Sequence, residues 1–566
     1  MKSKIKKEKT KKENWEELIY AYALKNAIEH NGKAISNFVL SPLFQHGLKK
    51  DKIKEIFLKI EEIVKKVNSL SEEEQIHEFN KISNKITKIN KKEKKEKDIL
   101  RKIKKKNKKI VTRIAPEPSK FCHIGHALSF LLNYLYAKEN KGKCYLRFED
   151  TNPDKESQEY VEAMKEDIIN YLGIKPDKIT FVSDDMLKLY KYAEELIKKE
   201  KAYVCFCPRD KIKNLRKLGV ECSCRKKNKR QNLIEWRRMI KGIYKEGEAT
   251  LRAIGDMQSL NYVMRDPVLF RIVEKEHFKQ KNKYAAWPTY DFYNPIEDSL
   301  MNITHVLRSN EFEVRAEFHD YLRKILNLKK PEIIQYGRFN VIGAITKGRE
   351  ILELIKSKKY IGWDDPRLVT LKALRRRGIV KETFYELIKQ IGLEKKQANI
   401  DFNIIAAINR KIIDKKAKRY SFVANPISLK IENKPNIKEI EVKIHPEKKE
   451  KRKIKIKENI FISQEDYEKY LEKEVRLMHL YNIRIEKEKA IFTSLENKEE
   501  LPKINWVSEF VKAKVLMDNA EWVNGYASSD IKKLKKNEII QFERFGFVRF
   551  DNINKNKEYE FWFAHR

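Results

Sequence analysis

Apolar and polar positions alternate differently in successive parts of the chain, and each pattern predicts a different kind of structure. Residues 15–24 and 53–64 carry apolar side chains at helical spacing, which predicts amphipathic helices before residue 84. From about residue 110 to 350, short apolar strands alternate with helices, as a doubly wound parallel sheet requires. The chain is therefore predicted to begin with a helical region that is followed by an α/β domain.

The pattern changes again after about residue 400. The segments 427–431, 440–444 and 539–550 are rich in β-branched and aromatic residues and are predicted to be strands. Phe545 and Phe547 are two residues apart in the last segment, so we expect both on one strand face. That placement favours a role in the core over a role as platforms for stacked bases.

A proline-containing turn followed by two histidines lies near the start of the α/β region. Pro116 and Pro118 impose extended or turn backbone, and the apolar run that follows predicts a helix. His123 and His126 then share one face of the first helical turn, beside unpaired backbone N–H groups and the positive end of the helix dipole. Gly125 removes a side chain where a ligand would approach. This combination predicts a nucleotide triphosphate site, although an isolated pair would more often be two ordinary surface histidines.

The charge of the chain indicates a polyanionic partner. Its 124 Lys and Arg residues outnumber 83 Asp and Glu residues, which gives a formal net charge of +41. A general lysine bias accounts for part of this excess, because lysine is spread through the whole chain. The lysine-dominated run at 85–109 is either a solvated helix or linker or an arm that binds phosphate, and the sequence leaves both open.

The hydrophobic segments give no indication of a membrane protein. No apolar run approaches the length needed to span a bilayer, and residues 1–7 lack the apolar core of a signal peptide. We therefore expect a cytoplasmic protein without a membrane partner.

Four of the six cysteines form two close pairs separated by 14 residues: Cys205 with Cys207, and Cys222 with Cys224. In a cytosolic chain disulfides are disfavoured, and such clusters indicate a metal ion. Four thiolates can complete a tetrahedral structural Zn²⁺ site, although C-x-C spacing is less specific than C-x₂-C. Free structural thiols are the alternative. The other two, Cys122 and Cys144, are predicted to be small core residues.

The segment 113–126 resembles the HIGH motif of class I aminoacyl-tRNA synthetases, in the form carried by the glutamyl and glutaminyl enzymes. Further strings match this family in the same order over roughly residues 110–566: 146–153, 263–272, 287–292, 303–308, 362–367, 373–378, 409–414, 541–550 and 563–566. A chance match of so many strings in one order is very improbable. The glutamyl enzymes often carry a zinc-binding cluster near the position of the four cysteines, which strengthens the zinc interpretation.

The resemblance implies a multidomain α/β architecture, which agrees with a length of 566 residues. A Rossmann-like doubly wound catalytic domain is expected at 110–204 and 285–350, interrupted at 205–284 by an inserted domain that binds the tRNA acceptor end and holds the Cys cluster. The remaining expected regions are a helical N-terminal extension with a Lys-rich linker at 1–109, a helical connecting subdomain at 351–400 and a β-barrel anticodon-binding region at 401–566. The predicted C-terminal strands favour the archaeal type of glutamyl enzyme, because bacterial ones are helical there.

The resemblance also implies a two-step reaction with ATP, Mg²⁺, L-glutamate and tRNA(Glu). The glutamate carboxylate attacks the α-phosphate of ATP, and a terminal tRNA hydroxyl then takes the acyl group from glutamyl-adenylate. Catalysis would depend on positioning and on charge stabilisation, without a protein nucleophile. The implied catalytic residues are His123 and His126, as neutral or cationic donors, and Lys347 of a degenerate KMSKS loop at 343–350. The implied ATP-binding residues are Pro116, Glu117, Pro118, His123, Gly125, His126, Arg338 and Lys347.

Glutamate has a negatively charged side chain, so its pocket needs fixed cations. The pocket residues implied by the resemblance are Arg113, Glu149, Tyr290, Asn294 and Arg308. Glu149 suits the α-ammonium group, whereas Arg113 and Tyr290 suit the end of the side chain. Arg308 stands where glutaminyl enzymes usually have Cys, and Asn294 stands where they have His, so both favour glutamate. For Arg308 a surface ion pair is the alternative.

Three further features bear on the interpretation. Lys120 replaces the Gly that is usual before the HIGH string, and the loop around Lys347 is altered, which leaves room for slow adenylation or for a repurposed relative. The arginines at 375–377 are expected to face RNA, with acidic side chains as the alternative partners. The alternative functions are a glutaminyl enzyme and a catalytically weak tRNA-binding protein, and use of tRNA(Gln) as a second substrate stays open.

Overall fold

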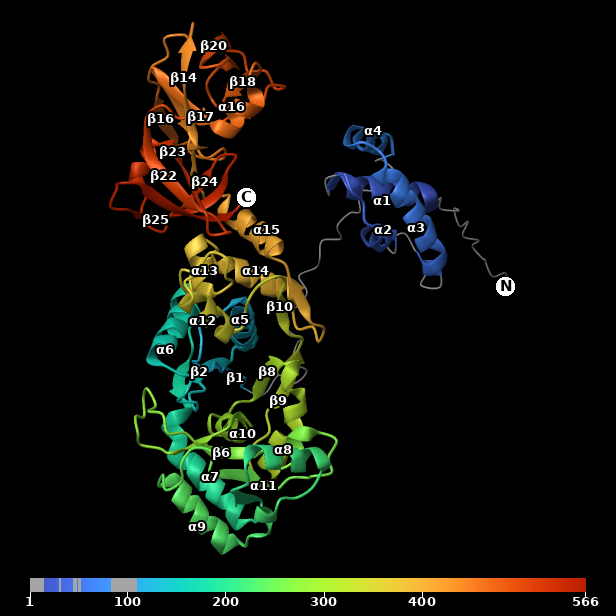
Figure 1. The fold of residues 1–566 in the computed structure, drawn as a ribbon, viewed down its shortest axis with the longest axis vertical. Coiled ribbons are helices and arrows are strands. Elements are labelled where there is room, and N and C mark those ends of the chain that lie inside the picture. The colour runs from blue at the N-terminus through green and yellow to red at the C-terminus, as the bar shows by residue number, and fades with distance from the viewer. Residues whose placement is uncertain (1–14, 30–31, 44–47, 49–51, 83–108) are drawn as a thin grey trace, which may run out of the picture. The chain divides into compact units, whose positions relative to one another are not determined.

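The computed structural model describes residues 15–29, 32–43, 48, 52–82 and 109–566 (Figure 1). The chain divides into two compact units, Met1–Lys97 and Asp98–Arg566, which we describe separately. Most of the lysine-dominated run at 85–109 lies outside the described residues. Within the described residues, no helix has both the length and the apolar character needed to cross a bilayer.

The first unit is helical, as predicted. Its helices are α1 (Trp15–Glu29), α2 (Ser36–Leu43), α3 (Ile53–Asn68) and α4 (Glu72–Ile82). Helix α1 packs against the other three through a core that includes the fully buried Leu24 and Ile60. Gln75 is also fully buried, and its side-chain amide donates to the carbonyl oxygens of Gly32, Val67 and Leu70 at 3.0, 2.9 and 3.2 Å. This one side chain therefore joins α4 to the ends of its neighbours.

The second unit begins with the predicted doubly wound parallel sheet. Its strands are β1 (Val111–Ile114), β2 (Lys143–Phe148), β3 (Lys178–Phe181), β8 (His305–Ser309) and β9 (Glu332–Tyr336). β1, β2 and β3 pair in parallel, as do β8 and β9. The backbone N–H of Thr304 donates to Val111 O at 3.0 Å, which places β8 beside β1. The order β3-β2-β1-β8-β9 therefore reverses its direction between β1 and β8, where open α/β sheets form a crevice.

The helices of this domain lie between its strands in sequence. They are α5 (Ile124–Glu139), α6 (Gln158–Lys165), α7 (Met186–Lys198), α10 (Tyr290–Leu300) and α11 (Ala316–Ile325). Helix α5 is the predicted apolar helix, and it packs against β1, β2 and β8 with Leu128 and Leu131 fully buried. Cys122 and Cys144 are buried in the same core, so the prediction for these two cysteines is confirmed.

An antiparallel sheet is inserted between β3 and β8. Its strands, in the order β4-β5-β6-β7, are β4 (Ala202–Cys205), β5 (Thr250–Ala253), β6 (Val268–Ile272) and β7 (Ala286–Pro288). The helices α8 (Arg209–Leu218) and α9 (Lys229–Ile240) lie between β4 and β5 in sequence, and α9 packs against α7 and β4. Trp236 and Trp287 lie in the core of this sheet and its helices. The sheet begins at Ala202, before the predicted boundary at 205, and ends at Pro288, after the predicted boundary at 284.

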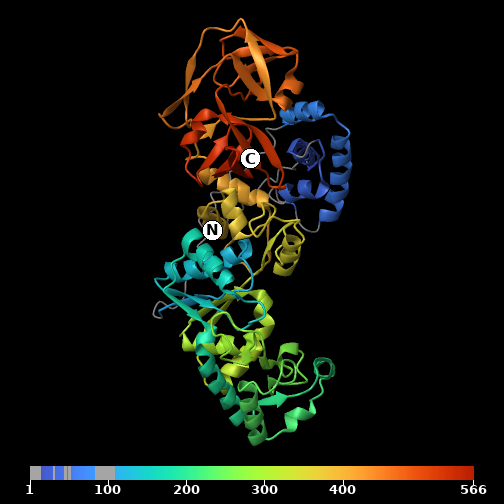
Figure 2. The same ribbon diagram turned by 60° about the vertical axis from the view of Figure 1, so that its left-hand side comes forward.

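A helical region follows the parallel sheet. It contains the parallel pair β10 (Phe339–Val341) and β11 (Ala398–Ile400) and the helices α12 (Gly348–Lys356), α13 (Leu371–Arg377), α14 (Lys381–Ile391) and α15 (Phe402–Ile413). Helix α14 packs on α5, and α13 packs on the last two strands of the chain. This region therefore connects the α/β domain to the C-terminal sheets, as Figure 2 shows from a second side.

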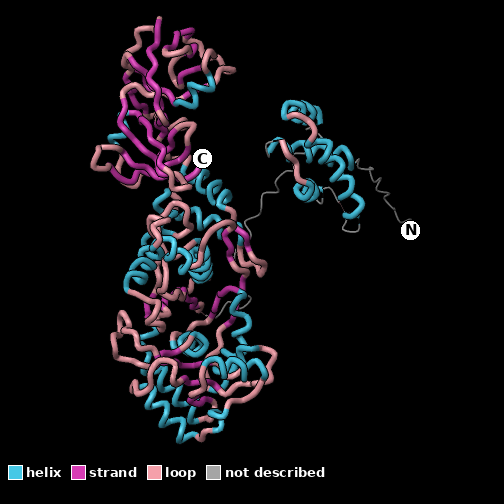
Figure 3. The backbone as a smooth tube through the Cα atoms, viewed as in Figure 1, coloured by secondary structure: helices cyan, strands magenta, loops and turns pink. Residues whose placement is uncertain are grey.

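The rest of the chain is mainly β, as predicted (Figure 3). A seven-stranded sheet has the order β12 (Arg419–Tyr420), β24 (Ile539–Phe542), β25 (Gly546–Ile553), β26 (Tyr559–His565), β22 (Phe510–Leu516), β23 (Trp522–Ser528) and β13 (Phe422–Ala424). A six-stranded sheet has the order β17 (Asn459–Ser463), β14 (Pro426–Glu432), β20 (Lys489–Ser494), β19 (Asn482–Ile485), β18 (Glu474–Leu477) and β21 (Lys503–Ile504). The C-terminal region also contains a two-stranded ribbon, β15 (Glu439–Lys443) with β16 (Lys451–Lys455), and the helix α16 (Gln464–Tyr470).

Two sequence-based expectations about this region need correction. The segment 539–550 is two strands, β24 and β25, joined by a turn. Phe545 lies in that turn, so it does not share a strand face with Phe547. Both rings nevertheless pack in the protein interior, Phe545 against Phe422 at 5.0 Å and Phe547 against His565 at 5.4 Å between ring centroids, which confirms their assignment to the core.

The arginines of α13 bind other parts of the protein. Arg375 pairs with Glu166 at 2.5 Å, and Arg376 pairs with Asp364 and Asp551 at 2.6 and 2.7 Å. Arg377 is buried and donates to the backbone carbonyl oxygens of residues 366, 563 and 564. The expectation that all three face RNA is therefore wrong for Arg377, and the acidic alternative describes the other two.

Asn409 of α15 offers a test of how the connecting region holds the last strand. It is fully buried, accepts from Val380 N at 3.0 Å and Thr383 Oγ1 at 2.8 Å, and donates to His565 Nε2 at 2.9 Å. Asn409→Ala should lower the free energy of unfolding by about 2–4 kcal/mol, because it leaves several buried polar groups without partners. Denaturant unfolding followed by tryptophan fluorescence measures this loss. The exposed Asn403→Ala in the same helix should cost less than about 0.5 kcal/mol, and equal losses in both variants would contradict the prediction.

Candidate active site

A cavity of about 620 Å³ opens at the C-terminal ends of β1, β2 and β8. This position is the reversal point of the sheet, where α/β domains bind their ligands. The residues predicted from the sequence that line it are Arg113, Pro116, Glu117, His123, Gly125, His126, Glu149, Tyr290, Arg308 and Arg338. Three predicted residues, Pro118, Asn294 and Lys347, do not line it.

The two histidines cap the N-terminus of α5 with their own rings. His123 Nδ1 accepts from the Gly125 N–H, and His126 Nδ1 accepts from the His123 N–H, each at 3.1 Å. Because each Nδ1 is an acceptor, each ring is neutral and carries its proton on Nε2. Burial, together with the charges of Lys120 and Arg338, lowers the pKa of His123 to about 3. Burial and the neighbouring His123 lower the pKa of His126 as well.

Gly125 is required by this cap. A Cβ at this position would lie 3.0 Å from Cε1 and 3.2 Å from Nδ1 of the His123 ring. A side chain would therefore displace the ring that accepts from its own backbone N–H. The structure therefore explains Gly125 by the His123 ring that lies against it. The sequence had suggested instead that the glycine makes room for a ligand.

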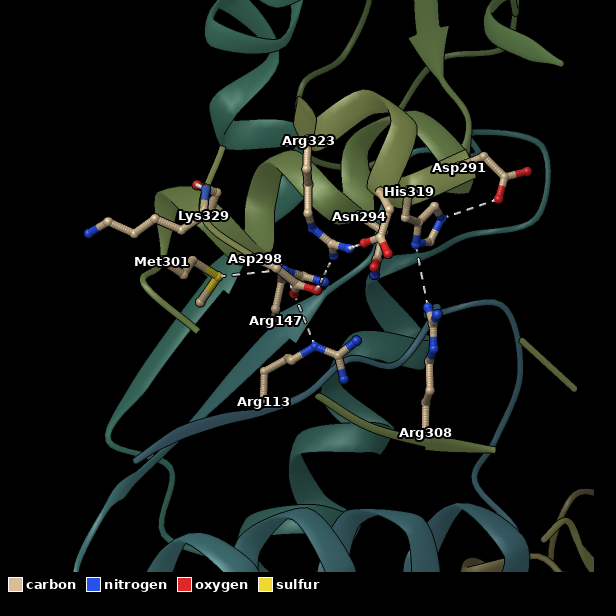
Figure 4. A network of polar contacts seen from close by, with 12 residues as sticks. Arg113, Arg147, Asp291, Asn294, Asp298, Met301, Arg308, His319, Arg323 and Lys329 are labelled. Carbon is tan, nitrogen blue, oxygen red and sulfur yellow. Dashed lines mark hydrogen bonds and ion pairs between the residues drawn. The ribbon is translucent and has the colours of Figure 1, made fainter. Parts of the chain in front are cut away.

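A buried network of charges lies behind the cavity wall (Figure 4). Asp298 Oδ1 accepts from Arg147 Nη1 at 2.9 Å and from Arg113 Nε at 3.0 Å, while Arg323 approaches Oδ2 at 4.0 Å. Burial opposes ionisation of Asp298, but the three guanidinium groups outweigh it and lower its pKa to about 2. Arg147 also donates to Glu149 Oε1 at 3.0 Å. The network thereby fixes Arg113 and Glu149, which both reach the cavity.

Asn294 acts on the cavity through Glu149. Its side-chain N–H donates to Glu149 Oε1 at 3.2 Å, and Tyr293 donates to Oε2 at 3.3 Å. Burial raises the pKa of Glu149, and the nearby Arg147 and Arg113 work against that rise. The predicted pocket residue Asn294 therefore orients a carboxylate on the wall and does not form the wall itself.

Arg308 has unused hydrogen-bonding capacity in the cavity wall. Only 5% of its surface is exposed, and its Nε and Nη2 have no hydrogen-bond partner among the residues that the structure describes. Its Nη1 lies 3.4 Å from Nδ1 of His319, whose Nε2 lies 3.3 Å from Asp291 Oδ1. Since arginine only donates, His319 Nδ1 is the acceptor and its ring proton points to Asp291. The alternative of a surface ion pair is wrong, because Arg308 is buried.

The two lysines near the cavity occupy different positions. Lys347 is exposed at the N-cap of α12, outside the cavity wall. Lys120 is half-buried and forms part of the wall beside His123.

Comparison with known families agrees with this geometry. Residues 109–415 match the catalytic domain of tRNA synthetases class I (E and Q), and residues 417–498 and 485–551 match two anticodon-binding domains of the same group. The chain belongs to the class I tRNA synthetases of the E and Q family. The resemblance stated from the sequence is thus confirmed, together with the multidomain α/β fold class.

Archaeal relatives match this synthetase over nearly its whole length. The glutamate–tRNA ligase of Pyrococcus furiosus is 38% identical, with 96% of this chain and 98% of the relative covered. That of Methanosphaera stadtmanae is 37% identical, with 97% and 99% covered. A solved glutamate tRNA ligase from Elizabethkingia meningosepticum is 18% identical with a TM-score of 0.41, covering 55% of this chain and 70% of that one.

The four paired cysteines of the synthetase come together at the end of β4. Their sulfur atoms all lie within 4.8 Å of one another, with 3.7 Å between Cys205 and Cys222 and 3.9 Å between Cys207 and Cys224. A tetrahedral Zn²⁺ with four thiolates requires about 3.8 Å between sulfurs. The four residues therefore fit a tetrahedral metal ion.

Several residues of the site were missed by sequence reasoning. Arg147, Tyr293 and Asp298 belong to the buried network, and Asp291 and His319 hold Arg308. A partial signal was present, because Asp298 follows the apolar residues Phe292, Pro295 and Ile296 in a buried part of α10, and a buried acid requires a partner. The partner's identity depends on β1 and β2, which are far away in sequence.

The neutral state of the two histidines gives a prediction about pH. Their depressed pKa values mean that both rings should stay neutral, with the proton on Nε2, from pH 8 to pH 5. Histidine ¹⁵N spectra of the folded synthetase, assigned with His123→Asn and His126→Asn, report this state directly. In urea both rings should titrate near about 6.5. Since the unfolded chain then binds more protons, stability should fall as the pH drops below that value. Titration of either ring near 6.5 in the folded protein would contradict the assignment.

Proposed function

We propose that this synthetase is a glutamate–tRNA ligase of the archaeal type. It joins L-glutamate to the 3′ end of tRNA(Glu) in two steps, with ATP and Mg²⁺ as the first co-substrates. In the first step a glutamate carboxylate oxygen bonds to the α-phosphorus, and the bond to the β-phosphate oxygen breaks to release diphosphate. In the second step a ribose hydroxyl of the tRNA attacks the acyl carbon, and AMP leaves. Glutamate–tRNA ligases that match nearly the whole chain support this reaction.

The observation that carries the choice of glutamate is the pair of unpaired donors on Arg308. Its buried Nε and Nη2 groups lack partners in the cavity wall, which Arg113 also lines. A carboxylate that reaches this guanidinium group would form charge-assisted hydrogen bonds with it. A glutamine amide would offer one oxygen and would bring its own N–H donors against the guanidinium group. The carboxyl group of Glu149, which accepts from Arg147, is the complementary group for the α-ammonium.

Neutral donors suit the triphosphate end of the reaction. In this proposal His123 and His126 donate from Nε2 to phosphate oxygens, next to the backbone N–H groups at the start of α5. Such donors stabilise charge that moves onto the phosphates without taking part in proton transfer. Arg338 lines the same cavity and adds a fixed cation. Lys347 stays a predicted ATP contact, although it is exposed outside the wall.

The tRNA partner follows from the other domains. The two matched anticodon-binding domains and a net charge of +41 support binding of tRNA(Glu), and tRNA(Gln) is a further candidate substrate. A reaction on tRNA is consistent with action in the cytoplasm. Acylation of purified tRNA(Glu) and tRNA(Gln) with each amino acid tests the choice of tRNA. Preferential use of glutamine would show a glutaminyl enzyme, and tight tRNA binding without acylation at any ATP concentration would show a silent RNA-binding relative.

Arg308→Cys tests the specificity assignment with the residue that glutaminyl enzymes usually carry. We expect kcat/KM for glutamate to fall about 10²-fold to 10³-fold, because a charge-assisted contact to the side-chain carboxylate is lost. The activity with glutamine should fall much less. ATP–diphosphate exchange with tRNA present measures both. The exposed Arg484→Cys outside the cavity should leave the ratio of the two amino acids unchanged, and an unchanged ratio in Arg308→Cys would reject the assignment.

We further propose that Cys205, Cys207, Cys222 and Cys224 hold one structural Zn²⁺. When bound, the ion would join β4 to the segment that follows α8, and it would take no part in the chemistry. A thiol-blocking mercurial should release one equivalent of zinc per wild-type chain, as measured with a metal-sensitive dye. Cys222→Ser should contain less than half an equivalent and should unfold at a lower temperature. Cys144→Ala, which changes a buried cysteine outside the cluster, should keep its metal. Wild-type protein that contains no zinc yet keeps its full stability would overturn this assignment.

A further inference from the structure

Lys120 is a cation in the cavity wall for which the structure provides no fixed partner. Its side chain is half-buried, and no hydrogen bond or ion pair involves its Nζ among the contacts of the described residues. Glu117 and Arg338 are the charged side chains that act on it, with opposite signs. Burial is the largest influence and lowers the pKa of Lys120. A ligand that brings negative charge would offset the cost of partly burying this ammonium group.

The stem of this side chain is held in place by the start of α12. An added Cβ on Gly348 would lie 3.2 Å from both Cβ and Cδ of Lys120, so the stem lies directly over the Gly348 backbone. Gly348 is the first residue of α12, a helix of nine residues. On its other side Lys120 is close enough to His123, the N-cap of α5, to lower the pKa of that ring. The starts of two helices, the neutral imidazole of His123 and the ammonium group therefore converge, and all of them favour an anion.

This position differs from the amino-acid end of the cavity. Asp298 holds Arg113, Arg147 holds Glu149, and Asp291 holds Arg308 through His319. Lys120 takes part in none of these contacts. In adenylation the α-phosphate must lie beside the amino-acid carboxylate. A cation beyond the imidazoles, at the start of α12, is then suited to the β- and γ-phosphates.

We propose that Lys120 binds the β- and γ-phosphates of ATP and supplies the cationic contact that the exposed Lys347 of the degenerate loop does not provide from the cavity wall. This inference rests on the proposed adenylation reaction. In the first step the electron pair of the breaking P–O bond passes to the leaving diphosphate, and the Lys120 ammonium group stabilises that charge. No proton transfer from Lys120 is required. Lys120 stands where the family usually has glycine, so the segment before the HIGH string would gain a phosphate contact.

Lys120→Met is the most informative variant, because methionine keeps an unbranched stem over Gly348 and removes the charge. We expect the Kd of a non-hydrolysable ATP analogue to rise tenfold or more, which is about the loss of one charge-assisted contact. The Kd of a glutamyl-sulfamoyl adenosine, which lacks both phosphates, should change less than about twofold. Lys120→Arg should restore most of the affinity for the ATP analogue. A purely structural role would weaken both ligands together.

The comparison variants complete the test. Lys356→Met removes an exposed cation at the other end of α12 and should leave both affinities unchanged. Lys347→Met should weaken the ATP analogue less than Lys120→Met does. Unaltered ATP-analogue affinity in Lys120→Met, or a larger loss in Lys347→Met, would overturn the inference. Binding of the ATP analogue is measured without an amino acid, so it tests Lys120 independently of the choice of glutamate. Absence of glutamate-dependent ATP–diphosphate exchange in the wild type would instead reject the proposed function.

Discussion

The site depends on the buried carboxylate of Asp298, which holds two arginines from different strands. Removing a charge of this kind from water is costly unless it is paired, and Asp298 is paired with Arg113 of β1 and Arg147 of β2. Arg147 in turn holds Glu149, so the cation and the anion of the cavity wall share one anchor. Reorienting either side chain alone would break one charge-assisted hydrogen bond of this buried network. The buried network therefore fixes the positions of one positive and one negative side chain, Arg113 and Glu149, in the cavity wall.

The cavity separates two kinds of recognition. At the end that holds Arg113 and Arg308, permanent cations are fixed by acids behind the wall, either directly or through the neutral ring of His319. At the start of α5 the donors are the neutral rings of His123 and His126, whose protonation is suppressed by burial. In the proposed reaction, the fixed cations would discriminate a carboxylate from an amide, and the neutral donors would stabilise the charge that passes to the leaving diphosphate. One cavity would then select its substrate by charge at one end and release diphosphate at the other.

The sequence predicted the fold class and the position of the site well, because both depend on the spacing of apolar residues and on short motifs within single segments. Prolines, an apolar helix and ordered motifs located β1 and α5, and most of the residues predicted for the site do line the cavity. The roles of single residues were harder to predict, since they depend on contacts between distant segments. Asn294 was expected in the wall but lies behind Glu149, 145 positions away, and Gly125 accommodates the ring of His123. The position of Lys347 outside the cavity wall was not predictable either, because whether a lysine faces a cavity depends on how its loop packs.

Helix α10 connects this site to the inserted sheet. Its Asp298 holds Arg113, and its Asp291 holds Arg308 through His319 (Figure 4). Its Asn294 donates to Glu149, so one helix supports three charged groups of the cavity wall. The residue before the helix, Thr289, donates from its backbone N–H to Leu269 O at 2.8 Å, and the helix packs on β6. The inserted sheet, which was expected from the sequence resemblance to bind the tRNA acceptor end, therefore packs directly against the start of α10. A shift of β6 would be transmitted to the helix that holds Arg113, Glu149 and Arg308.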